Sequence, residues 1–450
     1  HYADSNGWRR NGQQDQQSLS GRAGLYPGAG ELFVDYAAYK DSSGLPGYLT
    51  TTAYHADPRA SATPSDWQKR DGTRLRPGVK LPLTDALTLE AEVSTEGEDQ
   101  HANYASFGSR SDRNKDMLSF TPRLRWRHGL GGLGSETVLG LDYYDGDVDA
   151  RYSTAPRQKA SQTSSAAYFQ NVTSLSEAWA LTLGVRSQRL EQDAHQDAYP
   201  PWFSPAVDGS ATRRRNAWDL GASYSGQGWR AYGKAGTTFR FPNTDELFGF
   251  SAILGVPVFA GDLKPQHGTI IELGGSFALG PLQGRASLYR MRLEDEIGYD
   301  DAVGTNVNFD PTRRQGLEAE LDWRIAERLK ARLAYAYTDA EFRSGPYEGK
   351  RMPLVPRDKL TLQLTWDAGR AGSYSAAANH VGSRRYSGDF SNVRGMLAGY
   401  TTLDLQAAWN LKPWTVTARL LNALDKRYAP YAGYSPWIVD HYYYAADGRS

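Results

Sequence analysis

The residue types that carry most enzyme and metal chemistry are scarce in this chain. It has no Cys, which excludes disulfides, thiolate zinc sites, iron–sulfur clusters and a Cys nucleophile. Residues 129–134 (GLGGLG) formally fit the GxGxxG phosphate pattern. That pattern needs a strand before it and a helix after it, whereas β-type alternation lies on both sides here. We interpret it as a glycine-rich turn and, with no nucleophile elbow and no HExxH motif, predict that the chain is not an enzyme.

Four acidic residues, Asp142, Asp145, Asp147 and Asp149, offer the hard oxygen ligands that Ca²⁺ prefers. The full calcium-loop pattern is absent, so we interpret them as the solvated base of a loop. The eight His are scattered along the chain. The sequence therefore predicts no metal site and no cofactor.

The clearest binding signal is a set of aromatic and arginine residues in polar segments. Residues 431–444 hold six Tyr or Trp, residues 384–386 read Arg-Arg-Tyr, and residues 192–212 carry three more aromatics. Aromatic rings stack on flat groups, and guanidinium groups donate charge-assisted hydrogen bonds to anions. These segments suit a flat, anionic, partly aromatic ligand. The residues predicted to bind it are Trp202, Phe203, Arg384, Arg385, Tyr386, Tyr431, Tyr434, Trp437 and Tyr442.

Composition restricts the class of protein. The chain has 450 residues, with 51 Lys and Arg against 51 Asp and Glu. The absence of a basic excess argues against a nucleic-acid partner. The mean hydropathy of −0.61 and the lack of a long apolar run argue against a transmembrane helix. Aromatic residues nevertheless make up 12% of this polar chain.

The period of the hydrophobic pattern accounts for the aromatics. Apolar residues occupy every second position in residues 317–325 and 329–337, with charged or small residues between them. Period-2 alternation places one set on each face of a strand. The competing interpretation is a soluble β-sandwich or propeller, whose strands average about 5–6 residues. The alternating segments here, residues 313–326, 328–343 and 356–368, are much longer.

Connections alternate between short turns, such as residues 226–228, 280–281 and 412–413, and long loops. Short turns at one end and long loops at the other are typical of an outer-membrane barrel. We predict an all-β, transmembrane antiparallel β-barrel with about eighteen recognisable strands. In a barrel the Tyr cluster has a second interpretation, as part of the interfacial aromatic girdle. The long loops are predicted at residues 41–73, 96–114, 146–161, 192–212, 240–266, 343–355, 384–398 and 429–448.

Six segments in order along the chain carry a resemblance to a known family: residues 43–47 (SGLPG), 238–248 (TFRFPNTDELF), 261–266 (GDLKPQ), 306–320, 353–359 (PLVPRDK) and 421–428 (LNALDKRY). Together they resemble the sequence blocks of TonB-dependent outer-membrane receptors of the siderophore-receptor type. The residues that match the two central boxes are Phe239, Arg240, Pro242, Glu246, Leu247, Asp262, Leu263 and Pro265.

The resemblance implies a 22-stranded barrel closed by an N-terminal plug domain. Residues 1–450 are expected to form the barrel domain, incomplete because no stretch resembles the plug, the TonB-contacting box or the final strand. We expect these parts in the same polypeptide or in another chain. Haem receptors of this family often place a His near the two boxes, and here only His267 lies there. Because it follows Gln266 at the start of a predicted strand, we interpret it as a structural or girdle residue, which disfavours haem as the ligand.

The function that the resemblance implies is TonB-dependent import of a scarce nutrient, above all a ferric siderophore. The alternatives are cobalamin, haem or another metal or cofactor complex, and a passive porin-like channel. The implied partners are the ligand, the TonB–ExbB–ExbD energy complex acting through the missing N-terminal part, and outer-membrane lipid and lipopolysaccharide. The expected protein is a monomer in the outer membrane of a Gram-negative bacterium.

Overall fold

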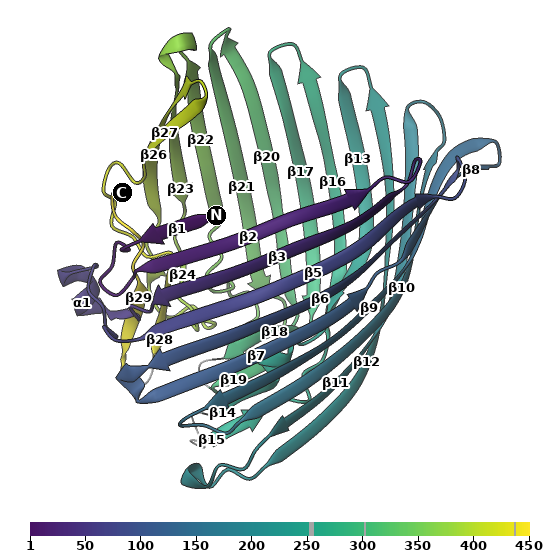
Figure 1. Cartoon of the computed structure of the whole chain (residues 1–450). Coiled ribbons are helices and arrows are strands. Elements are labelled where there is room, and N and C mark those ends of the chain that lie inside the picture. Colours follow the sequence, from purple (N-terminus) through teal and green to yellow (C-terminus); the bar gives the residue numbers. More distant parts are fainter. Residues whose placement is uncertain (252–255, 301–302, 436–437) are drawn as a thin grey trace.

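One long antiparallel sheet curves into the wall of a barrel (Figure 1). The computed structural model describes residues 1–251, 256–300, 303–435 and 438–450. Twenty strand segments form the sheet. They are β1 (Tyr2–Ser5), β2 (Gln14–Leu25), β3 (Glu31–Gly44), β5 (Trp67–Pro82), β6 (Leu87–Tyr104), β7 (Ser109–Phe120), β8 (Arg123–Leu130), β9 (Leu133–Tyr152), β10 (Gln158–Ser174), β11 (Trp179–Gln196), β12 (Val207–Gly226), β13 (Trp229–Arg240), β16 (Gln266–Leu279), β17 (Leu282–Glu294), β20 (Thr312–Ala326), β21 (Leu329–Phe342), β22 (Asp358–Asp367), β23 (Ser373–Val381), β26 (Tyr400–Leu411) and β27 (Trp414–Leu420).

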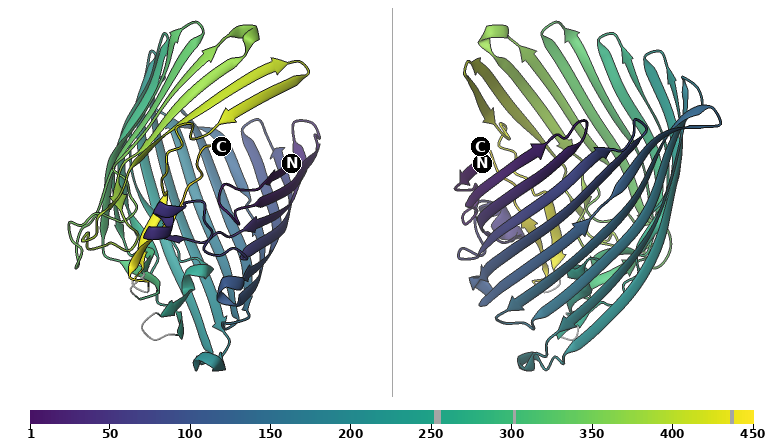
Figure 2. Two further views of the ribbon diagram at one scale, coloured as in Figure 1. Left: turned by 90° about the vertical axis from the view of Figure 1, so that its left-hand side faces the viewer. Right: turned by 45° about the vertical axis from the view of Figure 1, so that its right-hand side comes forward.

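Each strand of the wall pairs with the next one along the chain. β7 and β8 both pair with β6 and with β9, so they share one position and the twenty segments fill nineteen positions. The predicted antiparallel barrel is therefore confirmed, and its predicted strand number is close. β1 and β27 are the two ends of the sheet, and no pairing joins them within the described residues. Both chain termini lie on that side of the molecule (Figure 2).

The short turns lie where the sequence predicts them, at residues 227–228, 280–281 and 412–413. The GxGxxG segment is the turn between β8 and β9, in which Gly131 and Gly132 have φ of 60° and 84°. Glycine has no Cβ to clash in this left-handed region. The segment is thus a hairpin turn and has no helix that would face a phosphate.

Smaller elements occupy the connections at the opposite end, most of them long loops, with η1 in a short turn. They are β4 (Leu49–Thr50), α1 (Thr51–Ala56), η1 (Ala105–Phe107), η2 (Pro200–Trp202), η3 (Thr244–Leu247), β14 (Phe248–Ser251), β15 (Val256–Phe259), β18 (Glu296–Asp300), β19 (Thr305–Phe309), β24 (Arg384–Arg385), β25 (Met396–Leu397), β28 (Tyr431–Ser435) and β29 (Asp440–Tyr444); η4 (Gly369–Ala371) lies in a short turn. Among the described residues, no helix has both the length and the apolar character needed to cross a membrane.

Two predicted loops, residues 96–114 and 146–161, are wrong. β6 and β7 run through the first and turn only at residues 105–108, and β9 and β10 run through the second and turn at residues 153–157, so the acidic residues predicted at the base of a loop lie in β9. Charged residues occupy both faces of these strand ends, and without an apolar face the segment has no strand signature in the sequence. Conversely, residues 295–300 and 303–311 lie in a long connection that carries the β18–β19 hairpin, which the predicted loops do not include.

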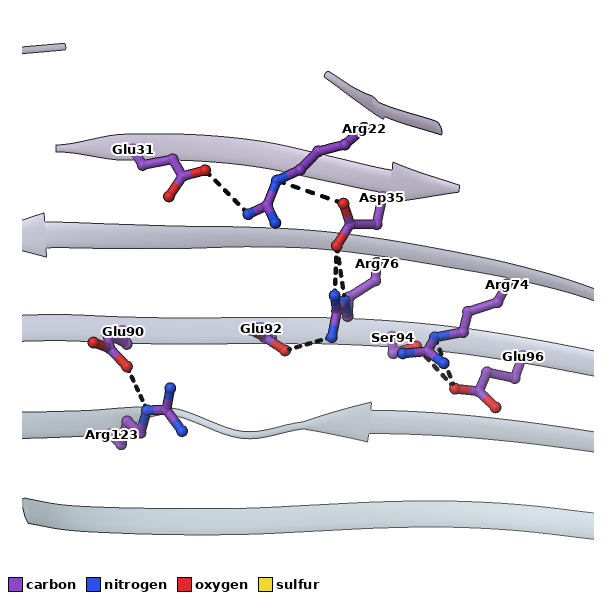
Figure 3. Close-up of polar contacts among 10 residues, drawn as sticks. All are labelled: Arg22, Glu31, Asp35, Arg74, Arg76, Glu90, Glu92, Ser94, Glu96 and Arg123. Atoms are coloured by element: carbon purple, nitrogen blue, oxygen red, sulfur yellow. Dashed lines mark hydrogen bonds and ion pairs between the residues drawn. The ribbon is translucent and has the colours of Figure 1, made fainter. Parts of the chain in front are cut away.

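The two faces of the wall differ as the alternation predicts. Leu360, Leu362, Leu364 and Trp366 on β22 are exposed on the outer face. The inner face carries an ion-pair ladder (Figure 3). Its paired side chains lie on adjacent strands: Arg22 with Glu31 (3.0 Å), Arg76 with Asp35 (2.5 Å) and Glu92 (3.4 Å), Arg74 with Glu96 (3.2 Å), and Arg123 with Glu90 (2.5 Å). The charges of this neutral chain are thus sorted toward the lumen and the loops.

The pleat of β9 divides the acidic cluster between the two faces. Asp142 and Asp145 are three residues apart, so they lie on opposite faces. Asp142 faces the lumen, where it pairs with Arg186 at 2.6 Å. Asp147 and Asp149 lie on the outer face with Asp145. Within the described residues, no group of three or more His, Asp or Glu side chains is arranged to hold a metal ion.

Candidate functional site

A small three-stranded sheet joins the first long loop to the last part of the chain. β28 pairs with β29, and β29 pairs with β4, so that Tyr442 lies opposite Thr50 and Tyr443 opposite Leu49. Asp440 accepts hydrogen bonds from the backbone N–H (3.1 Å) and the hydroxyl (2.7 Å) of Thr51 at the start of α1. These contacts span nearly 390 residues of sequence and build one rim surface beside the opening of the wall (Figure 2).

One face of this small sheet carries four tyrosines, which we call the tyrosine face: Tyr48, Tyr431, Tyr442 and Tyr444. The ring centroid of Tyr48 lies 5.5 Å from that of Tyr442 and 6.5 Å from that of Tyr444. Tyr431 lies 5.6 Å from Tyr444 and 6.1 Å from Tyr442. Tyr431 and Tyr444 are exposed. The tyrosine face thus presents clustered rings at a partly exposed surface of the rim.

The opposite face of the small sheet is buried. Tyr443 stacks on Tyr54 of α1 with centroids 4.7 Å apart, and its hydroxyl lies 3.3 Å from the hydroxyl of Tyr386. Ala432 and Leu397 complete this core. Burial raises the pKa of Tyr386, with its hydrogen bond to Tyr443 adding to the effect. Tyr386, one of the predicted ligand residues, therefore supports the rim from beneath.

The two predicted ligand arginines also hold backbone. Arg384 is buried, and its Nη2 donates to the carbonyl oxygens of Ala429 (3.0 Å) and Pro430 (2.6 Å). Arg385 Nη1 donates to the carbonyl of Arg394 at 2.7 Å. Guanidinium groups with several donors suit such carbonyl clusters. Arg384 thus fixes the approach to β28, whereas Arg385 holds its own loop, where it also lies 3.7 Å from Asp389.

The remaining predicted ligand residues fall into three places. Tyr431 and Tyr442 lie on the tyrosine face, whereas Tyr434 lies on the buried face. The guanidinium carbon of Arg394 lies 3.1 Å from the centroid of the Tyr434 ring. Phe203 follows η2 at the tip of a different loop and is 94% exposed, and Trp202 is the last residue of η2. Trp437 lies outside the described residues. The structure thus brings the predicted residues of the last two loops together and leaves the η2 loop elsewhere on the rim.

The family-box residues of the first box anchor a loop. Arg240, at the end of β13, pairs with Glu246 of η3 at 2.7 Å, and Glu246 accepts the backbone N–H of Asn243 at 2.8 Å. This closes a capping box at the start of η3. Leu247 is buried against the inner face of β10 and β11. Phe239 contacts the ring of Phe241, and Pro242 is fully buried with its carbonyl accepting from Gln192.

The second box continues the same anchor. Leu263 is buried with Ile297. Arg213 donates to the carbonyl oxygens of Leu263 (3.1 Å) and Gly261 (2.9 Å), and Arg215 donates to that of Pro265 (3.3 Å). Asp262 is exposed. Two of the three consecutive arginines at residues 213–215 therefore point inward and hold the loop.

The structure adds rim residues that the sequence-based set of ligand residues does not include. Tyr48 joins the tyrosine face through the pairing of β4 with β29, and Tyr444 joins it from the next outward position of β29. Arg9 lies close to Tyr444 and is held by the carbonyls of Pro46 and Gly47. The sequence could have pointed to Tyr48, because it directly follows the SGLPG block. It could not have shown that Tyr48 meets Tyr442 and Tyr444, because these residues lie at the other end of the chain.

The pH dependence of this rim follows from His441, on the buried face. Burial lowers the pKa of His441 below its ordinary 6.5, and the nearby Arg394 adds to this, against opposing effects of Asp440 and Asp389. A group whose pKa is lowered on folding binds its proton more readily in the unfolded chain, so stability falls as the pH drops below 6.5 toward the lowered folded value. We expect faster amide hydrogen exchange in β28 and β29 at pH 5.5 than at pH 7.5 after correction for intrinsic rates.

In a His441→Gln variant this acceleration should disappear. The pKa of Asp440 is also lowered, chiefly by the Thr51 hydroxyl, but its effect begins only near its ordinary 3.8. An equal acceleration in the variant between pH 7.5 and 5.5 would contradict the assignment to His441.

Comparison with known proteins agrees with this geometry. Residues 5–423 match the family model of TonB dependent receptor-like β-barrels. The iron-regulated outer membrane virulence protein of Vibrio cholerae serotype O1 is 26% identical over 318 residues, which cover 65% of this chain and 44% of that protein. The match thus spans less than half the length of this curated relative.

Solved structures show the same fold at low identity. The ferric citrate transporter FecA in its unliganded form has a TM-score of 0.83 at 17% identity, covering 100% of this chain and 71% of that chain. The ferric yersiniabactin uptake receptor FyuA from Yersinia pestis has a TM-score of 0.80 at 17% identity, covering 100% and 72%. The family comprises outer-membrane receptors of Gram-negative bacteria and not enzymes, as the sequence predicts. The chain belongs to the TonB-dependent receptor-like β-barrel family.

Proposed function

We propose that these 450 residues are the barrel of a receptor that imports a ferric siderophore across the outer membrane. The observation that carries the proposal is the tyrosine face at the rim. Each ring centroid of Tyr48, Tyr431, Tyr442 and Tyr444 lies within 6.5 Å of the centroid of another of these rings. Clustered rings at the mouth of a barrel suit a ligand with planar aromatic groups, which stack on them, while the hydroxyls donate to its oxygens.

The barrel wall suits passage of a polar cargo. Its inner face is lined by side chains such as Arg76 and Glu92, which neutralise one another in pairs. The proposal includes a plug that closes the lumen, in the same polypeptide or supplied separately, and a TonB–ExbB–ExbD complex that provides the energy. It also treats the receptor as a monomer.

Ligand binding to the purified receptor tests the cargo. Ferric complexes of catecholate, hydroxamate and citrate type are titrated while the fluorescence of the receptor Trp and Tyr is followed. We expect quenching at nanomolar concentration by a catecholate or mixed complex, and no quenching by the iron-free ligand at the same concentration. If haem or cobalamin quenches instead and no ferric siderophore does, the siderophore assignment is wrong while import of a metal or cofactor complex stands.

Transport separates the receptor from the passive alternative. Deletion of the full gene is expected to abolish growth on the bound ferric complex as sole iron source, and loss of TonB should have the same effect. A porin-like channel predicts the contrary result, namely uptake without TonB and rapid sugar flux through proteoliposomes.

Substitution of the tyrosine face tests the site itself. Tyr431→Ala combined with Tyr442→Ala removes two of the four rings, each expected to contribute about 1–1.5 kcal/mol beyond the area that it buries. We expect ligand affinity to fall roughly 30- to 150-fold. Tyr26→Ala, which removes an exposed tyrosine at a short turn at the other end of the barrel, is the matched control.

Equal affinity of the double variant and the Tyr26→Ala control would place the ligand elsewhere on the rim. Phe203→Ala then tests the η2 loop, the other predicted aromatic group. Loss of affinity in that variant alone would move the site to η2.

A further inference from the structure

The outer face of β16, β17 and β20 changes from apolar to basic toward the loop end of the barrel. Ile271, Leu273 and Leu288 are each more than half exposed on this face. Arg290 and Arg292 are the next two outward positions of β17 beyond Leu288, because alternate residues of a strand share a face. The three strands are neighbours in the wall (Figure 1).

The register brings a third arginine to the same patch. Arg290 lies between Ile271 of β16 and Gln315 of β20. Arg292 lies between Thr269 of β16 and Arg313 of β20. We call this outward surface, Arg290, Arg292 and Arg313 with Thr269 and Gln315, the basic patch.

Two of the three guanidinium groups have no compensating charge in the protein. Arg313 is only partly exposed and is compensated by two carboxylates of β21, Glu341 at 2.7 Å and Asp339 at 3.9 Å. Arg290 and Arg292 are exposed, and neither has a hydrogen bond or ion pair within the part of the chain that the structure describes. The next outward residue, Glu294, lies 3.3 Å from His267. On the lumen face of the same strand, by contrast, Arg285 is paired with Glu320 at 2.6 Å.

The position of the patch identifies its partner. The long loops of such a barrel face the outside, so the step from apolar to charged residues at this end lies at the headgroup level of the outer leaflet. We propose that the basic patch docks the phosphorylated headgroup of an outer-leaflet lipid. Arginine holds phosphate through two parallel N–H···O bonds, and the acyl chains lie along Ile271, Leu273 and Leu288 below it.

The charge of the wall also argues against a phosphate site on another part of the barrel. At the loop end of β7, β9 and β11, the outer face carries Asp116, Asp147 and Asp193 in one row. That side repels a phosphate. The lipid should therefore bind on the β16–β17–β20 side, and Lys159, an exposed cation opposite Asp149 on the acidic side, supplies a matched control.

The experiment uses the whole receptor purified from outer membranes into detergent micelles. Bis-phosphorylated lipid A is titrated, and the bound lipid is counted by native mass spectrometry. The double variant R290Q/R292Q is expected to bind it roughly thirtyfold more weakly, since each cation near an anionic lipid surface contributes about a fivefold factor. K159Q should bind as the wild type does. Matching far-UV circular dichroism establishes that both variants are folded.

Two further arms distinguish a lipid from a free anion. Lipid A without its phosphates should lose most of its affinity for the wild-type receptor, and excess inorganic phosphate should not displace the intact lipid. The proposal is overturned if R290Q/R292Q binds lipid A as tightly as the wild type. Displacement by inorganic phosphate, or an equal loss of affinity in K159Q, overturns it as well.

Discussion

An arginine in place of Leu362 is expected to destabilise the barrel by about 2–4 kcal/mol, because it puts a charge on the lipid face near the middle of the membrane. Leu362 is exposed on the outer face of β22, between Leu360 and Leu364, and the apolar run continues to Trp366. Hydrocarbon cannot solvate a guanidinium group, and the side chain is too far from either headgroup layer to reach it without cost. Unfolding in urea from lipid vesicles measures the loss.

The adjacent residue provides the control. Thr361 faces the lumen, where its hydroxyl donates to Asn379 at 3.0 Å, so Thr361→Arg places the same charge one position away on the polar face. It should cost well under half as much. If both substitutions destabilise the barrel equally, β22 does not present Leu362 to lipid and the assignment of the two faces is wrong.

Truncation of Phe342 is expected to open the rim without unfolding the wall. Phe342 ends β21 and is 1% exposed. Its ring lies within 6.2 Å of the ring centroids of Phe309, Tyr347 and Phe390, which come from three different loops. Phe342→Ala removes the common contact of these loops and should cost about 3–5 kcal/mol. Amide hydrogen exchange in residues 303–311, 343–357 and 382–399 should accelerate more than a hundredfold.

Tyr347→Ala is the matched control, because Tyr347 lies at the edge of the same cluster and is only partly buried. Its effect should be smaller and strongest in its own loop. The exchange of β16 and β17, which lie outside the cluster, should not change in either variant. Unaltered exchange of all three loops in Phe342→Ala would show that the cluster does not hold them together.

Strand alternation explains why so much of the wall was predictable. Leu360, Leu362 and Leu364 must face hydrocarbon while Thr361 and Gln363 must not, so the membrane imposes a period of two on the sequence. The same logic explains the errors at residues 96–114 and 146–161. Those strand ends rise beyond the apolar layer, where the solvent is polar on both sides and the period vanishes.

The rim was predictable only as a set of residue types. The sequence placed Tyr431 and Tyr442 in one loop with Tyr434, but the pleat of β28 turns Tyr434 to the buried face. Arg384 and Arg385 were expected to meet a ligand, and in the structure they donate to the carbonyls of Ala429, Pro430 and Arg394 instead. Nothing local in the sequence distinguishes an arginine that binds a ligand from one that binds backbone.

The sequence by itself determined the class of the protein, the direction of its strands and the segments that carry its boxes, because these depend on periodicity and on residues close together in the chain. Only the tertiary structure decided what the boxes do and where the rim lies. Arg240 meets Glu246 because a loop folds back onto the wall, and Tyr48 meets Tyr442 because two strands almost 400 residues apart pair. The contact of Tyr48 with Tyr442 follows from the curvature of the long sheet, which brings the two ends of the chain to one side of the molecule, and this curvature leaves no periodic trace in the sequence.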